Sequence, residues 1–471
     1  MKRLRAWGLA GVLTGLLACT GLAVSAQSPA AGSGAVSGAV SGNVTLDVTP
    51  DAGRALARQA LNSGNPDLAA RIAAQLVQAD PTDIGALLLL AAGSARSGHA
   101  EAGYDAGVKA YHLATTPAQR FEAAFLTAEA LSVADKPAAA KHWLRRAATY
   151  SPGPQESAVL RDAFQKLQAR TPLNFSVTFA GGPSNNVNGG SLHDRFLLFG
   201  VLPLPIAVAL PGWTLSTTSQ LSYRIIAKPK MAASLYAIAR QRNVWLAPRA
   251  YVLLAQPGQP DVNNADYLYN SLDLGGTVNW ARSDTLAFSL DARAGRRWVG
   301  GALQNDQQRL VFGITKALTA NRLGHLDLTA ERTHNPRPLH PNTLRLALNG
   351  SLSKPLPGGT LQAEFGLTDL ESGAAGEAYH ALSAGLDWQP KTPLLGVVAD
   401  VFVQAEVTDY WKTTGFRPDL QLEAGAMARF PQATAYGFVP TVTLSASRSM
   451  SQFVLRDTST IGIAFGLSSS F

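Results

Sequence analysis

The chain has 471 residues, of which 46% are hydrophobic, and its formal net charge is +8. This length allows two or three domains, and beyond the N-terminal segment no uninterrupted apolar run approaches the roughly 18 residues that a membrane-spanning helix needs. A charge of this size over so long a chain gives no reason to expect a nucleic-acid partner.

Residues 1–26 have the composition of a secretory signal peptide. A basic start precedes an apolar stretch from about residue 9 to residue 24, and small residues follow. We predict cleavage after Ala26. The competing interpretation is a lipoprotein box at residues 16–19, which would leave Cys19 lipidated at the mature N-terminus. With cleavage after Ala26 the mature chain has no cysteine, and therefore no thiol to mispair in an oxidising compartment.

Residues 27–50 are rich in Gly, Ser and Ala and contain a near-repeat of Gly-Ala-Val-Ser. Such a composition cannot bury enough apolar surface to fold, so we predict a flexible linker.

Residues 51–170 change in character, because alanine and leucine dominate and charged residues recur at helical spacing. Turn signals recur about every 34 to 37 residues, which matches the tetratricopeptide period, in which each unit is a helix hairpin stacked on its neighbours. The predicted ends of the first helices are Gly64-Asn65, Gly98-His99 and Asp135-Lys136, and those of the second helices are Asp80-Pro81, Thr116-Pro117 and Ser151-Pro152.

About three such units are expected, followed by a capping helix near residues 155–168 with Leu160, Phe164 and Leu167 on one side. Small residues occupy positions where two helices must approach closely, among them Ala69, Ala73, Gly103, Ala106, Ala110, Ala140 and Ala147. The alternative is an ordinary helical bundle. A stacked array would present a concave surface to a peptide or a protein.

Residues 171–471 form a series of short alternating segments. In the last segment Ile461, Ile463, Phe465 and Leu467 share one face, and small or polar residues share the other. A period of two with one apolar face is typical of a strand between two environments. Because such strands recur without helices between them, and because the polar face carries charges in strand after strand, we predict a closed antiparallel barrel that spans an outer membrane. The alternative is a soluble β-sandwich or barrel, whose core would be apolar.

The predicted polar faces carry charged residues that would line the interior of such a barrel. They are Arg293, Glu331, Arg345, Glu364, Glu406, Glu423 and Arg429. Two interpretations remain open for them: a solvated wall with balancing charges, or a polar conduit for an extended polypeptide or glycan.

No catalytic motif is found in the sequence. It has no phosphate-binding glycine loop, no nucleophile elbow and no spacing typical of metal ligands. His193 and Asp194 are adjacent and would point in opposite directions on a strand, and His334 precedes a proline-rich turn. We therefore expect no enzymatic activity, no cofactor and no metal site.

The chain resembles the surface lipoprotein assembly modifier (Slam) family. A first strand at residues 173–179 leads into an asparagine-rich turn with Asn185, Asn186 and Asn188, and the closing hairpin runs from Ser447 to Phe471. The terminal Phe471, with Phe465 and Leu467 at alternate positions before it, looks like the assembly signal of outer-membrane barrels in general.

The resemblance implies a helical-repeat domain in the periplasm followed by an outer-membrane barrel of about fourteen strands. Its implied function is to capture client proteins, such as surface lipoproteins or small secreted proteins, and to move them to the cell surface. The implied partners are the client, outer-membrane lipid and the barrel assembly machinery. Residues 201–210, which include Pro203 and Pro205, depart from a regular strand and are predicted to form a surface loop or a plug.

Two other functions fit the same domain order. One is an exopolysaccharide exporter, in which helical repeats also precede an outer-membrane barrel. The other is a passive porin whose helical domain only binds partners.

Overall fold

The computed structural model describes residues 49–198, 202–255, 259, 261–319, 321–336, 341–374, 376–393, 396–412 and 418–469. The predicted cleavage site at Ala26, the linker up to residue 48, Val201 and Phe471 lie outside the described residues. The chain divides between Arg170 and Thr171 into two compact units.

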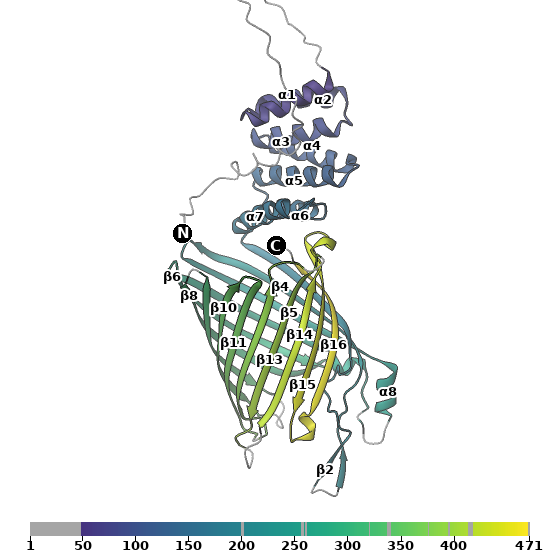
Figure 1. The fold of residues 1–471 in the computed structure, drawn as a ribbon, viewed down its shortest axis with the longest axis vertical. Helices are drawn as coiled ribbons and strands as arrows, with labels where there is room; N and C mark the ends of the chain where they lie inside the picture. Colours follow the sequence, from purple (N-terminus) through teal and green to yellow (C-terminus); the bar gives the residue numbers. More distant parts are fainter. Residues whose placement is uncertain are drawn as a thin grey trace, which may run out of the picture. The chain divides into compact units, whose positions relative to one another are not determined.

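The first unit contains seven helices among its described residues (Figure 1). They are α1 (Pro50–Asn62), α2 (Pro66–Ala79), α3 (Ile84–Arg96), α4 (Ala100–Leu113), α5 (Pro117–Val133), α6 (Pro137–Ala148) and α7 (Pro154–Arg170). Each helix packs against the next, and α1, α3 and α5 also pack in succession. The unit is therefore a stack of three helix hairpins with a final helix.

The three hairpins share one turn geometry. Gly64, Gly98 and Asp135 all have positive φ, and in each case the amide of the following residue donates to a carbonyl five positions earlier, at 2.8, 2.8 and 2.9 Å. This is the Schellman ending of a helix, for which glycine is the usual residue. Because the same ending recurs at the predicted positions, the helical hairpins repeat in structure as well as in sequence.

Small residues build the core of this unit. The predicted close-approach alanines are all at most 5% exposed, so the helices approach with little side-chain volume between them. On α7, Leu160, Phe164 and Leu167 are buried together as predicted, and they give the last hairpin an apolar partner.

The second unit is a closed barrel of fourteen antiparallel strands among the described residues, as predicted. The strands are β1 (Leu173–Ser184), β4 (Gly212–Lys228), β5 (Met231–Leu246), β6 (Tyr269–Ser283), β7 (Leu286–Val299), β8 (Ala302–Thr319), β9 (Arg322–His334), β10 (Thr343–Leu356), β11 (Gly359–Ser372), β12 (Tyr379–Pro390), β13 (Val398–Asp409), β14 (Pro418–Arg429), β15 (Phe438–Met450) and β16 (Thr458–Ser469). Each strand pairs with its neighbours in sequence, and β16 closes on β1.

The outer face of the barrel is apolar. Cross-strand pairing places one unbroken apolar row across ten strands: Val278, Leu290, Phe312, Leu328, Leu348, Leu367, Leu382, Val407, Leu420 and Met450. Leu328 and Leu382 are 55% and 57% exposed. The predicted outer residues of the last strand, Ile461, Ile463, Phe465 and Leu467, are also exposed. An apolar band on a closed barrel is the surface that lipid covers.

None of the described helices is long and apolar enough to cross a membrane.

Among the described residues, the seam between β1 and β16 is the shortest pairing in the barrel. It has four register pairs, Phe179 with Leu467, Ala180 with Gly466, Gly181 with Phe465 and Ser184 with Gly462. By contrast, all twelve residues of β1 pair with β4 on its other side. The described part of the seam therefore has fewer main-chain hydrogen bonds than the other strand pairs.

The two ends of the barrel carry different connections. Residues 229–230, 284–285, 320–321 and 357–358 join strands at the end where β1 begins, directly after residue 172. The two longest connections, residues 185–211 and 247–268, lie at the opposite end. The first of them contains the hairpin β2 (Arg195–Leu198) and β3 (Leu202–Pro205), and the second contains α8 (Pro248–Leu254).

The irregular segment at residues 201–210 is part of a loop at the barrel end. Leu202–Pro205 pairs with β2 in a separate two-stranded sheet, and Figure 1 shows this hairpin extending past the ends of the barrel strands. Val208 and Leu210 pack with Val187, Val244 and Leu246 in a small apolar cluster at the base of the loop. In the described residues the segment is therefore a surface loop.

Candidate functional site

The inner face of the barrel is polar and charged, and its charges are unevenly distributed. On β5 to β10 the described inward positions carry six arginines and four acidic residues: Arg240, Arg242, Arg293, Arg297, Arg309, Arg345, Asp273, Asp291, Asp327 and Glu331. On β11 to β14 they carry six acidic residues and one arginine: Glu364, Asp387, Asp400, Glu406, Asp419, Glu423 and Arg429. We name these two parts of the wall the basic arc and the acidic arc.

The remaining inward positions, on β15, β16, β1 and most of β4, are hydroxyl, amide or small side chains, apart from Val439 near the start of β15. All seven charged residues predicted to line the interior point inward, because each pairs with other inward residues and alternates with exposed apolar ones. The wall therefore presents three different surfaces to a solute: the basic arc, the acidic arc and an uncharged part.

A cavity of about 370 Å³ lies on the wall where the two arcs meet. His325 and Asp327 of β9, Gln362 and Glu364 of β11 and Gln404 of β13 contribute to its lining. His325 Nε2 lies 2.9 Å from Asp327 Oδ2, and Gln362 Nε2 donates to Glu364 Oε1 at 2.6 Å. The lining side chains are thus held by one another.

The asparagine-rich turn after β1 fixes the loop of residues 185–211 to the start of β16. Asn185 Oδ1 accepts from the amide of Ile461 at 2.7 Å. Asn186 is 6% exposed; its amide group donates to the carbonyl of Gly190 and accepts from the amide of Gly190, both at 2.9 Å. Asn188 donates to the carbonyl of Val208 at 2.8 Å and accepts from the amide of Leu210 at 2.9 Å. Each predicted asparagine therefore has a structural contact of its own.

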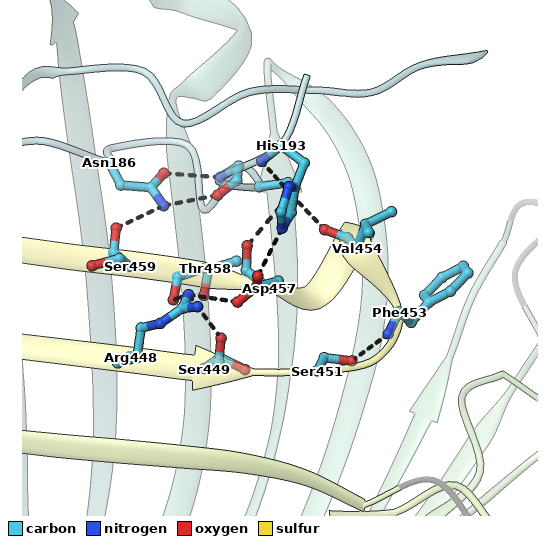
Figure 2. Close-up of polar contacts among 12 residues, drawn as sticks. Asn186, His193, Arg448, Ser449, Ser451, Phe453, Val454, Asp457, Thr458 and Ser459 are labelled. Atoms are coloured by element: carbon cyan, nitrogen blue, oxygen red, sulfur yellow. Dashed lines mark hydrogen bonds and ion pairs between the residues drawn. The ribbon is translucent and has the colours of Figure 1, made fainter. Parts of the chain in front are cut away.

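His193 contacts Asp457 rather than the adjacent Asp194. Figure 2 shows His193 reaching the connection before β16, where its Nε2 lies 2.8 Å from Asp457 Oδ2. Arg448, from the end of β15, lies 2.5 Å from the other carboxylate oxygen of Asp457. Ser191 also donates to the carbonyl of Val454. We call this group (Ser191, His193, Arg448 and Asp457) the clasp, because it joins the loop after β1 to the β15–β16 connection.

The clasp predicts a pH dependence for the loop. Partial burial raises the pKa of Asp457, but hydrogen bonds from His193 and Arg448 outweigh this effect and hold its pKa below its ordinary value. The stabilisation is therefore complete above the unfolded pKa of about 3.9 and is lost as the pH falls through the lower, folded pKa. We expect limited proteolysis within residues 185–211 to be slow and constant from neutral pH down to about 4, and to accelerate only below it. An acceleration between pH 7 and 5 would contradict this.

A second cavity, of about 1090 Å³, lies on the helical unit. Glu101, Tyr104 and Asp105 line it from α4, and Lys136 and Trp143 line it from α6 and the turn before it. The Trp143 ring is held edge-on by Tyr111 at 5.3 Å, and Arg146 lies over it at 4.7 Å. Trp143 is only 7% exposed and forms the floor of the cavity, while the half-buried Tyr104 and charged groups of both signs are more accessible. Such a mixture suits a polypeptide ligand.

Two of the three predicted assembly-signal residues, Phe465 and Leu467, lie on the outer face of β16. Among the described residues no group of three or more His, Cys, Asp or Glu side chains is placed to hold a metal ion.

Neither the clasp nor the grouping of inward charges into two arcs was predicted from the sequence. Single charges are visible in the alternation, but their neighbours depend on strand register.

No family model matches the chain, and no curated protein matches it. Among solved structures, the translocator domain of the autotransporter NalP from Neisseria meningitidis is 12% identical, covers 67% of this chain and 98% of its own, and has a TM-score of 0.27. OprB from Pseudomonas putida is 8% identical, covers 66% of this chain and 96% of its own, and has a TM-score of 0.37. OccAB3 from Acinetobacter baumannii is 8% identical, covers 63% of this chain and 98% of its own, and has a TM-score of 0.33.

At these identities and TM-scores the comparisons report a distant likeness and identify no family. The structure itself combines an N-terminal helical unit with a closed fourteen-stranded barrel. Its apolar exterior and polar interior make it a barrel of the outer-membrane type.

Proposed function

We propose that this protein is an outer-membrane translocator that captures client proteins in the periplasm with its helical repeats and delivers them through or along its barrel to the cell surface. The clients would be surface lipoproteins or small secreted proteins. The observation that carries the proposal is the direct covalent connection of a repeat unit to the short-turn end of a barrel with a polar wall. A passive pore needs no such unit.

The lengths of the connections between strands support a periplasmic location for the helical unit. In outer-membrane barrels, short turns face the periplasm and longer loops face outward. Here β1 follows α7 after two residues and begins at the end that carries four of the five two-residue turns between barrel strands; the fifth, residues 300–301, is at the other end, which also carries the two longest loops. The helical unit would therefore be on the periplasmic side of the membrane, where it could meet a client before export.

The helical unit supports the capture role. Stacked hairpins give an extended surface that suits a peptide or protein ligand, and the cavity beside Trp143 has polar and aromatic groups for such a ligand. We propose binding without catalysis, so the unit acts as a receptor. The barrel assembly machinery would recognise the last strand through Phe465, Leu467 and Phe471.

Deletion of residues 51–170 tests the capture role. We expect the variant to lose surface display of its client, because the periplasmic receptor is gone, while the barrel remains in the membrane fraction and heat-modifiable on gels. The client is first identified by pull-down with residues 49–170 as bait, and display is then measured by protease accessibility on intact cells.

Display at the normal level in the deletion variant would refute capture by the repeats. Recovery of glycan alone from the bait would instead favour an exopolysaccharide exporter.

A further inference from the structure

Four neighbouring strands bring three arginines into one row on the inner wall. Arg293 of β7 pairs directly with Arg309 of β8, Arg309 pairs with Glu331 of β9, and Glu331 pairs with Arg345 of β10. We call these three arginines the arginine row. Strands are about 4.8 Å apart, so the row extends roughly 14 Å along the wall.

Placing like charges directly opposite one another on neighbouring strands destabilises the folded barrel. Arg293 and Arg345 both lie close enough to repel Arg309, while Glu331 and Asp291 attract it. The one acidic group within the row, Glu331, lies 3.9 Å from Arg309, which is beyond hydrogen-bonding distance. A barrel wall with no ligand would gain by separating these charges.

The nearest other carboxylates already have partners. Asp291 accepts from the hydroxyl of Tyr236 at 2.6 Å, and Asp273 pairs with Arg240 at 2.6 Å. Among the described residues Arg293 has no ion pair, and the Nε atoms of Arg293 and Arg309 are buried without a protein hydrogen-bond partner. Arg345 donates to Thr368 Oγ1 at 3.3 Å and is also hydrogen-bonded to Tyr379. Each guanidinium has five N–H donors, so the remaining terminal N–H groups of the arginine row, and its positive charge, stay available to a ligand.

We propose that the arginine row binds carboxylate groups of an extended polypeptide in transit through the barrel. Guanidinium groups bind carboxylates with two parallel hydrogen bonds, which makes arginine the favoured residue for such contacts. This inference rests on the proposed passage of cargo through the lumen, and it adds the chemistry that the wall recognises.

The acidic arc favours a polypeptide over an acidic glycan. A uniformly anionic polymer would meet six acidic side chains with a single arginine on β11 to β14. A polypeptide with charges of both signs can place carboxylates on the arginine row and lysines or arginines on the acidic arc. Charge complementarity of this kind selects a partner and suppresses others.

Binding can be measured on the full-length protein in detergent, by fluorescence anisotropy. The probes are fluorescein-labelled peptides of equal length (one with Glu and Gly, one with Glu and Lys, one with Gly and Ser) and a labelled oligogalacturonate. We expect both Glu-containing peptides to bind, the Gly-Ser peptide not to bind, and affinity to fall with added salt.

The variants R309Q and R345Q should each weaken binding of the Glu-Gly peptide about tenfold or more, because hydrogen bonds to a charged group are lost. R309K keeps the charge and should retain part of the affinity. R332Q is the matched control, since Arg332 is exposed on the outer face one residue after Glu331, and it should change nothing. Heat-modifiability shows that each variant is folded.

Several results would overturn the inference: no binding of either Glu-containing peptide to the wild type, equal loss in R332Q and R309Q, or tighter binding of oligogalacturonate than of the mixed-charge peptide. R309Q, R345Q and R332Q all carry the same helical unit, so a loss in the first two relative to R332Q does not depend on that unit. If binding holds while the deletion of residues 51–170 leaves display intact, only the capture role fails.

Discussion

Replacing Val403 by arginine is expected to destabilise the folded barrel in the membrane, whereas replacing the adjacent Gln404 by arginine is expected to leave its stability close to that of the wild type. Val403 is 49% exposed on the outer face at the middle of β13, between Leu386 and Ala424 on the neighbouring strands. An arginine facing lipid near the bilayer midplane costs about 2–4 kcal/mol. Gln404 points inward, pairs with Glu423 and lines the cavity beside Glu364, so an arginine there gains carboxylate partners.

The two variants carry the same added charge one residue apart, which makes each the control for the other. Heat-modifiability on gels and equilibrium unfolding in lipid vesicles measure the difference. Equal folding of both variants would contradict the assignment of an outer, lipid-covered face, and with it any role in a membrane.

Replacing Asn186 by alanine is expected to open the loop of residues 185–211. The side chain of Asn186 is buried and satisfies the carbonyl of Gly190, and it shares the amide of Gly190 with Asn188. Its Nδ2 also lies 3.5 Å from the carbonyl of Ser459 on β16 (Figure 2). Leaving a buried backbone group without a partner costs about 1–3 kcal/mol. Because cleavage follows the population of the open form when closing is fast, proteolysis of the loop should accelerate roughly tenfold or more.

The matched control is Asp194→Ala in the same loop. Asp194 is exposed, and its side chain lies 3.6 Å from the exposed Arg195, so this variant should be cleaved at the wild-type rate. Wild-type behaviour of Asn186→Ala would show that the asparagine turn does not hold the loop. An intact heat-modifiable barrel in both variants separates loop opening from failed assembly.

The clasp also bears on how the barrel closes. The β1–β16 seam has four register pairs, and the contacts of Asn185, Asn186, Ser191 and His193 reach the strand or connection on the other side of that seam. The loop thus adds side-chain hydrogen bonds to the strand pair that has the fewest register pairs among the described residues. Its asparagines are explained by closure of the barrel and require no ligand.

Local sequence rules are sufficient to predict the helix ends and the two faces of each strand. Helix endings at Gly64, Gly98 and Asp135 follow from backbone conformations that only a few residues adopt easily. Strand faces follow from a period of two, which is why alternation alone places Leu328 and Thr329 on opposite sides of their strand, as observed. Both rules act over a few residues and need no knowledge of distant partners.

Contacts between residues far apart in the chain cannot be predicted in this way. His193 and Asp457 are separated by 264 positions, and neither has a local pattern that specifies the other. The arginine row likewise requires the registers of three strand pairs at once, and a one-residue slip in any of them would turn an arginine outward.

By itself, the sequence determined a helical-repeat unit and a closed barrel with an apolar outside, because side-chain periodicity records the environment of each face. Only the tertiary structure decided which side chains meet: the division of the inner wall into basic and acidic arcs, the arginine row, and the clasp over the seam. The physical reason is that these groupings arise from strand register and barrel closure, which join residues far apart in the chain.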